Sequence, residues 1–131
     1  MLGNDYAEIY RRYLKEAVSV GGLGKNILKA DASNEFHGIP SSGCFCLLPY
    51  GIGPLILGKV TCVEIQQVLV DAANAYFNKD TYPNLSFVQG DLRKLTYKDK
   101  TFDAVIDLST LDHMKFDEGL HVIDEYARVL K

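Results

Sequence analysis

Four acidic residues stand at or just beyond the ends of apolar segments that are long enough to be strands. The segments span 26–31, 59–65, 85–89 and 102–108, and the acidic residues are Asp31, Glu64, Asp91 and Asp107. If these segments form one parallel sheet, their carboxyl ends meet at a single edge, where open α/β sheets bind ligands. Carboxylates at that edge accept hydrogen bonds from hydroxyl and amino groups. The spacing therefore predicts a ligand-binding site along one edge of a sheet.

Glu64 is the strongest single candidate among these residues. It lies near the end of a segment rich in β-branched residues, 59–65. In nucleotide-binding α/β folds, an acidic residue at this place accepts hydrogen bonds from both ribose hydroxyls. The alternative is a solvated carboxylate at a strand end, with no ligand.

His113 is the candidate for acid–base chemistry. It closes the stretch Asp-Leu-Ser-Thr-Leu-Asp-His at 107–113, which follows the last predicted strand. An imidazole titrates near neutral pH, so it can act as a general base. A partly exposed loop histidine with no catalytic role fits the sequence equally well.

Helices are predicted between and around the strands. Asp5 and Glu8 form a capping pair for a helix over 5–20, which Gly21 and Gly22 end. A second helix is predicted over 66–78 and a third from Asp117 onwards. The apolar residues at helical spacing are Leu69, Ala72, Ala73, Tyr76 and Phe77 in the second helix, and Leu120, Ile123, Tyr126, Ala127 and Leu130 in the third. The N-terminal helix either packs on the sheet or covers a ligand.

Composition limits the classes of function. The chain has 131 residues, enough for one domain over 1–131, and 47% are hydrophobic. A net charge of −3, with no cluster of Lys and Arg, gives no indication of nucleic-acid binding. The apolar stretch 44–57 is too short to span a bilayer and contains two prolines and two glycines, so no membrane association is predicted.

Cysteine usage predicts a reducing, cytoplasmic compartment, because there are three cysteines and no signal-peptide pattern. Cys44, Cys46 and His37 lack the spacing of common zinc sites, and no metal site is predicted. The glycine pair Gly51 and Gly53 lies only 11 residues before Glu64, where a dinucleotide-binding turn normally lies about 20 residues before its acidic residue. A nicotinamide-dependent oxidoreductase is therefore disfavoured.

Three motifs, taken in order, carry a family resemblance. Gly90-Asp91 follows a strand, Lys-Thr-Phe-Asp at 100–103 opens the next, and the sequence closes on Arg-Val-Leu-Lys at 128–131. With the Glu64 strand upstream, the region 25–131 resembles the cofactor-binding half of class I S-adenosylmethionine-dependent methyltransferases. The resemblance implies a Rossmann-like three-layer α/β sandwich with a mostly parallel sheet of strand order 3-2-1-4, shortened relative to the seven-stranded fold of the family.

The resemblance also implies a site for S-adenosylmethionine. Its residues would be Asp31, Asn34 and Glu35 around the methionine ammonium, Glu64 and Ile65 at the ribose, Asp91 and Leu92 at the adenine, and Asp107 and Leu108 near the sulfonium. In the family, the Asp91 position accepts a hydrogen bond from the adenine amino group and the Leu92 N–H meets a ring nitrogen. One departure is clear, because residues 32–37 lack the usual glycine-rich turn and resemble a rarer variant built on Leu-Lys-x-Asp with a following Asn-Glu.

Two functions therefore remain open. The first is methyl transfer to an unidentified acceptor, and the second is a catalytically inactive methyltransferase-like module that binds other proteins. The family normally continues beyond Arg-Val-Leu-Lys with further strands, so the fourth strand is expected to lie at a sheet edge. The sequence is then a fragment, a degenerate member of the family, or a subunit that pairs this edge with another chain, most simply a second copy of itself.

Overall fold

The computed structural model describes residues 12, 16, 26–30, 59–80, 82–107 and 110–131. Within them the elements run in the order β1 (Asn26–Ala30), β2 (Lys59–Glu64), α2 (Gln67–Tyr76), β3 (Leu85–Gln89), β4 (Ala104–Ile106), η3 (Leu111–His113) and α3 (Phe116–Val129). Arg12 and Glu16, the described residues of the predicted helix 5–20, are both helical. The described helices include none that is long and apolar enough to cross a membrane.

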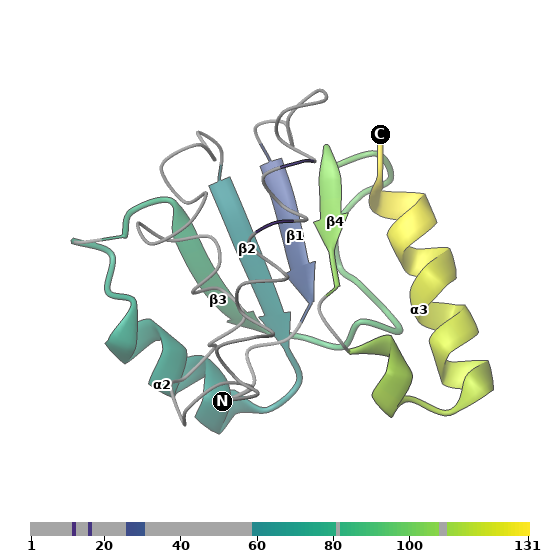
Figure 1. Cartoon of the computed structure of the whole chain (residues 1–131), viewed down its shortest axis with the longest axis horizontal. Helices are drawn as coiled ribbons and strands as arrows, with labels where there is room; N and C mark the ends of the chain where they lie inside the picture. Colours follow the sequence, from purple (N-terminus) through teal and green to yellow (C-terminus); the bar gives the residue numbers. More distant parts are fainter. Residues whose placement is uncertain (1–11, 13–15, 17–25, 31–58, 81, 108–109) are drawn as a thin grey trace.

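The four strands form a parallel sheet in the order β3-β2-β1-β4, which confirms the predicted topology. Ala30 pairs with Val63 across β1 and β2, and Glu64 pairs with Gln89 across β2 and β3. Because all strands run the same way, their carboxyl ends lie together, at the lower end of Figure 1, where η3 and the start of α3 also lie. The sheet thus brings the predicted ligand-binding ends to one place.

Helix α2 packs on one face of the sheet. Its buried residues are Val70 and Ala73, and the adjoining Phe77 stacks on Phe87 of β3 with ring centroids 5.7 Å apart. This confirms the predicted Ala73 and Phe77, but Tyr76, also predicted to face inward, is 45% exposed, and the buried Val70 was not predicted. Tyr76 turns outward and touches the edge of Phe77 instead of entering the core.

Helix α3 packs on the opposite face of the sheet. Val122, Tyr126 and Val129 of α3 join a core cluster with Leu28, Ala30 and Val63, whose side chains point away from the α2 side because neighbours along a strand alternate. Leu92, Leu95 and Phe102, from the segment between β3 and β4, complete the cluster. The two helices and the sheet make three layers.

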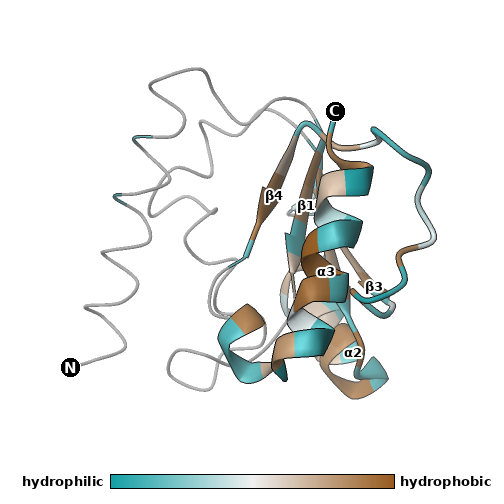
Figure 2. Ribbon diagram, turned by 90° about the vertical axis from the view of Figure 1, so that its right-hand side faces the viewer, coloured by the Kyte–Doolittle hydropathy of each residue, from teal (hydrophilic) through white to brown (hydrophobic). Residues whose placement is uncertain are grey.

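The buried face of α3 is only partly the predicted one, because Tyr126 is buried as predicted but Leu120 and Ile123 are not. Leu120 and Ile123 are 47% and 49% exposed, whereas Val122 and Val129 are fully buried. Both sets of residues recur at spacings of three and four, so the spacing alone could not choose between them. Figure 2 shows the consequence, since apolar and polar patches mix on the visible side of α3.

Strand β4 is shorter than the predicted segment 102–108. Phe102 does not pair with β1 but forms a parallel bridge with Leu130, just after α3, and its N–H donates to the Val129 carbonyl at 2.8 Å. Asp103 binds Asn26 in both directions, with its N–H to the Asn26 carbonyl and its carboxylate to the Asn26 N–H. The strand ends at Ile106 because Asp107 starts the turn that leads to η3.

Gly90, directly after β3, joins the end of β2. Its N–H donates to the Glu64 carbonyl at 2.9 Å, and a Cβ at this position would lie 2.9 Å from Cγ1 of Val63. That distance is too short for a real side-chain contact, and Val63 is itself buried with 2% exposure. The approach of the two strands therefore requires glycine at position 90.

We expect Gly90→Ala to destabilise the fold by about 1–3 kcal/mol, because the added methyl group overpacks a closed contact. The matched control is Gly119→Ala in α3, where the added methyl group meets nothing within 4 Å. That change should stabilise the protein by about 0.5–1 kcal/mol through helix propensity. Chemical denaturation measures both, and equal effects of the two variants would contradict the packing argument.

Candidate functional site

A cavity of about 470 Å³ opens at the carboxyl ends of β2 and β3. Its walls come from the two strand ends, the start of α2, the turn after β3, η3 and the first turn of α3. The lining residues are Val63, Glu64, Ile65, Gln66, Leu69, Gly90, Asp91, Leu92, Arg93, Thr110, His113, Met114 and Glu118. Five residues predicted from the sequence are among them: Glu64, Ile65, Asp91, Leu92 and His113.

Glu64 is the last residue of β2 and is 5% exposed. Its Oε2 accepts a hydrogen bond from the Gln66 N–H at 2.9 Å, which holds the carboxylate at the start of α2. The parallel ladder places Gln89 opposite Glu64, so the chain emerging from β3 passes directly beside this carboxylate. A buried carboxylate that lines a cavity is suited to accept hydrogen bonds from a polar ligand.

Asp91 lies two residues beyond β3 and is held by Arg93. Its Oδ1 accepts hydrogen bonds from the backbone N–H of Arg93 at 2.9 Å and from Nε of Arg93 at 3.0 Å. Its Oδ2 accepts a hydrogen bond from Nη2 of Arg93 at 2.8 Å. The hydrogen bond from the guanidinium is the main reason why the pKa of Asp91 lies below its ordinary value. Asp91 therefore stays ionised and fixed in orientation.

Arg93 also reaches across the cavity. Its NH1 lies 3.5 Å from Oε1 of Glu118, in the first turn of α3. The cavity lining thus holds three carboxylates, on Glu64, Asp91 and Glu118, and one guanidinium. Such a lining favours a cationic or a donor-rich ligand over an anionic one.

Leu92 presents a backbone donor at the same wall. The residue is 7% exposed, and no hydrogen bond found among the described residues has its N–H as the donor. A buried N–H without an acceptor costs free energy, so such groups are rare and often face a ligand. A ring nitrogen is an acceptor of the kind this N–H needs.

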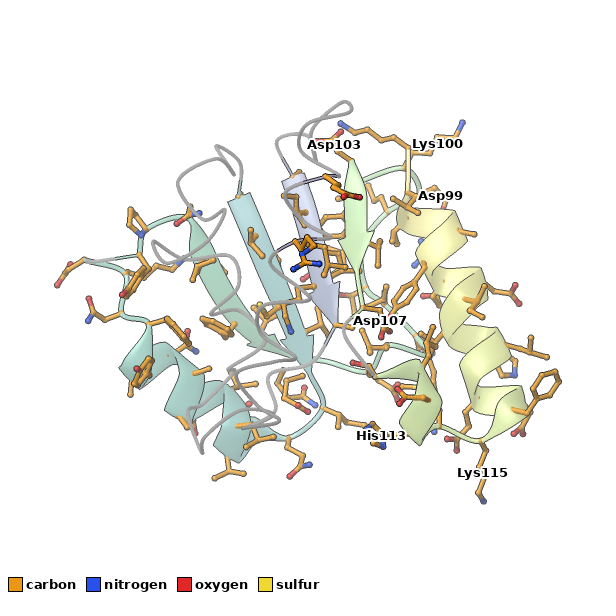
Figure 3. All side chains as sticks on the ribbon, in the orientation of Figure 1. Asp99, Lys100, Asp103, Asp107, His113 and Lys115 are labelled. Carbon is orange, nitrogen blue, oxygen red and sulfur yellow. The ribbon has the colours of Figure 1, made fainter. Side chains whose placement is uncertain are left out.

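His113 ends the short helix η3 and lines the cavity from the side opposite β3. Figure 3 shows it at the end of the sheet where the strand arrowheads lie, whereas Asp99, Lys100 and Asp103 lie at the opposite end. His113 is exposed, so its imidazole is accessible from solvent. Its place fits the predicted general base.

Asp107, predicted to lie near the sulfonium, is not among the residues that line the cavity. Its Oδ1 accepts the Thr110 N–H at 2.9 Å, and its Oδ2 accepts the Tyr126 hydroxyl at 2.8 Å. Figure 3 places it above His113, beside α3. These contacts show that Asp107 fixes the turn that carries His113 and ties that turn to α3.

Several lining residues were not predicted from the sequence. Arg93 has a recognisable signal, because it stands two residues after Asp91. An aspartate side chain commonly accepts a hydrogen bond from the backbone N–H two residues later, which forms a tight local turn. Thr110, Met114 and Glu118 have none, since they meet the cavity only through the packing of η3 and α3. Gln66 and Leu69 enter it because α2 begins directly after the Glu64 strand end.

Asp31, Asn34, Glu35 and Leu108 lie outside the described residues, and so do His37, Cys44 and Cys46. Within the part of the chain that the structure describes, no three His, Cys, Asp or Glu side chains gather as metal ligands would.

Comparison with known proteins gives this arrangement a family. Residues 53–131 match a family described as "Methyltransferase domain". The chain belongs to this methyltransferase family. Over 73 residues it is 37% identical to the sterol 24-C-methyltransferase ERG6B of Gibberella zeae, a match that covers 55% of this chain and 19% of that protein.

Solved structures show the same fold at low sequence identity. The PH0226 protein from Pyrococcus horikoshii superposes with a TM-score of 0.65 at 26% identity, covering 93% of this chain and 53% of that one. The [4+2]-cyclase SpnF superposes with a TM-score of 0.68 at 23% identity, covering 92% of this chain and 41% of that one. The chain thus spans 19% of the curated relative's length, 41% of the SpnF chain and 53% of the PH0226 chain.

The contact between Arg93 and Asp91 predicts a change in titration. Replacing Arg93 by Gln should raise the pKa of Asp91 towards its ordinary value, because the hydrogen-bonded guanidinium is lost. Since the native pKa is lowered, this contact stabilises the fold above the unfolded-state pKa, and the contribution disappears as pH falls through the native pKa.

Carboxyl chemical shifts followed by NMR over an acidic pH series measure this directly. Lys94→Gln is the matched control, because Lys94 is the neighbouring cation and its side chain does not contact the Asp91 carboxylate. An Asp91 titration that moves equally in both variants would show that general charge, and not the Arg93 contact, sets its pKa.

Proposed function

We propose that the cavity binds S-adenosylmethionine and that the domain transfers its methyl group to an acceptor. One observation carries the proposal. Glu64, Asp91 and Leu92 line one cavity at the carboxyl ends of β2 and β3, and among the described residues no hydrogen bond from the Leu92 N–H is found. Membership of the methyltransferase family supports the same reading.

Each of the three groups has a partner in the adenosine part of the cofactor. Glu64 accepts hydrogen bonds from the ribose hydroxyls, as an acidic residue at the end of a β2-type strand does in nucleotide-binding folds. Asp91 accepts one from the adenine amino group, and the Leu92 N–H donates to a ring nitrogen. Arg93 holds the Asp91 carboxylate in place through hydrogen bonds to both of its oxygens.

Size and charge fit the same cofactor. A volume of about 470 Å³ lies within the usual range for small-molecule sites. The lining carries more carboxylates than cations, which favours a ligand with an ammonium and a sulfonium. Asp31, Asn34 and Glu35 follow β1 in sequence, and we propose that they bind the ammonium end.

When bound, S-adenosylmethionine supplies an electrophilic methyl carbon attached to a sulfonium. The chain's task is to hold the acceptor atom, the methyl carbon and the sulfur in line, because this alignment dominates the rate. His113 takes the proton that the acceptor loses as it gains the methyl group. Asp107 acts through the turn it holds, since Thr110 and Leu111 both donate to its carboxylate.

A second candidate is a methyltransferase-like domain without methyl transfer. The feature that favours it is the glycine-poor stretch 32–37, which replaces the turn that usually admits the cofactor. Failure to bind the cofactor at millimolar concentration would support this candidate. Binding without turnover would instead indicate a domain that recognises the cofactor but does not transfer its methyl group.

The proposal also covers the cellular compartment of the protein and its self-association. A cytoplasmic location is supported by the odd number of cysteines, of which Cys62 is a buried thiol in β2. Self-association through β4 is supported by its place at the end of the strand order β3-β2-β1-β4. Light scattering over a wide concentration range tests this assembly, and a monomer at all concentrations would exclude it.

Calorimetric titration with S-adenosylhomocysteine tests the function, because this product has the same adenosine part. We expect Glu64→Ala to weaken binding by about 1–3 kcal/mol, since buried hydroxyl groups lose a charged acceptor. Asp124→Ala is the matched control, because Asp124 is an exposed carboxylate of α3 that does not line the cavity. Equal dissociation constants for the Glu64 variant and the parent would remove Glu64 from the site.

A further inference from the structure

Arg128 of α3 lies outside the cavity lining, yet it holds the segment that follows the cavity wall. NH1 donates to the Tyr97 carbonyl at 2.7 Å and to Asp99 Oδ1 at 3.0 Å, and NH2 donates to the Leu95 carbonyl at 3.0 Å. Nε and NH2 also donate to the two oxygens of Glu125, each at 2.9 Å. All five donors of the guanidinium are therefore engaged.

Glu125 and Arg128 together bind both backbone groups of Leu95. Oε2 of Glu125 accepts the Leu95 N–H at 2.6 Å, while Arg128 donates to the Leu95 carbonyl. Leu95 thus has both backbone groups bound by a single ion pair of α3. Arg128 also lowers the pKa of Glu125, so the pair stays ionised at neutral pH.

Backbone contacts continue the attachment beyond Leu95. The Lys100 N–H donates to the Arg128 carbonyl at 2.9 Å, and the Phe102 N–H donates to the Val129 carbonyl at 2.8 Å. Lys100 reaches this position with φ at 54°, a left-handed conformation that is unfavourable for a residue with a side chain. The attachment is therefore strong enough to hold a strained residue.

The segment held in this way begins at the cavity. Asp91, Leu92 and Arg93 line it, the Lys94 N–H donates to the Asp91 carbonyl at 3.1 Å, and Leu95 follows directly. Leu92 and Leu95 are both 7% exposed and share one core cluster. A shift of Leu95 would therefore move the Asp91 carboxylate and the Leu92 N–H together.

We propose that Arg128 and Glu125 are a positioning pair that sets the turn 91–94 at the distance at which it recognises the amino group of a purine. This inference rests on the proposed adenosine site. Neither side chain touches the ligand, and the pair acts through the backbone of Leu95. Its loss should weaken the preference for a 6-aminopurine more than it weakens binding of the ribose and the amino acid.

The test compares S-adenosylhomocysteine with S-inosylhomocysteine, which carries a carbonyl oxygen in place of the amino group. Binding of both is measured by calorimetry for the parent, Arg128→Lys and Glu125→Gln. We expect the parent to prefer the adenosine compound and each variant to lose about tenfold of that preference, the effect of about one hydrogen bond. Lysine keeps the charge but cannot engage the same five acceptor contacts.

The matched control is Lys79→Met, at the opposite end of β3, where Lys79 donates to the Ser86 hydroxyl at 2.6 Å and to the Leu85 carbonyl. It removes a similar tie between a side chain and the backbone, far from the cavity, and should leave the preference unchanged. All titrations use variants whose circular dichroism matches the parent, and Glu125→Gln serves if Arg128→Lys does not fold.

The outcomes separate the two proposals. If the parent binds neither compound, the adenosine site itself is wrong and the inference falls with it. If the parent prefers the adenosine compound and both variants keep that preference, the ion pair is only structural and the inference is overturned. An equal loss in Lys79→Met would also overturn it, because general destabilisation would then explain the effect.

Discussion

The site depends on one close contact, where Gly90 packs against the Val63 side chain near the end of β2. The hydrogen bond from the Gly90 N–H to the Glu64 carbonyl, 2.9 Å long, extends the parallel ladder past the last paired residues. Because no Cβ stands between Gly90 and Val63, the chain leaves β3 directly beside the Glu64 carboxylate. Asp91 and Leu92 then follow within two residues, so acceptors and a donor share one cavity wall. A wider separation of the strands would divide them between two surfaces.

The other walls depend on α3, which supports the site without supplying most of it. Tyr126 donates to Asp107 and so holds the turn that carries His113. One residue before and two residues after Tyr126 on the same helix, Glu125 and Arg128 hold Leu95 behind the Asp91 turn. Contacts from one helix therefore hold both sides of the cavity in position, and that helix packs on the sheet through Val122 and Val129. This arrangement lets irregular segments hold fixed positions.

The sequence was sufficient to predict the strands, their order and the gathering of Glu64 and Asp91, because parallel topology alone brings strand ends together. It was only partly sufficient for the helix faces, since it included the buried Ala73, Phe77 and Tyr126 but not every buried residue of α2 and α3. Val122 and Ile123 are both apolar and both fit a helical stripe, and only contact with the sheet selects Val122. Nor could the sequence assign the role of Asp107. It does not distinguish a carboxylate that binds a ligand from one that accepts a hydrogen bond from the Tyr126 hydroxyl. The local sequence pattern predicts whether a segment is a helix or a strand, whereas the packing of distant segments decides which contacts each side chain makes.

The central claim is that the adenosine part of the cofactor lies between Glu64 and the turn at Asp91. Amide chemical-shift mapping by NMR during titration with S-adenosylhomocysteine tests it most directly. The Gln66 N–H reports on the Glu64 carboxylate to which it donates, and the Leu92 N–H gains an acceptor. The account predicts saturable shifts at both, with little change at Thr101 near the opposite end of the sheet. Shifts confined to that opposite end, or none at millimolar ligand, would contradict it.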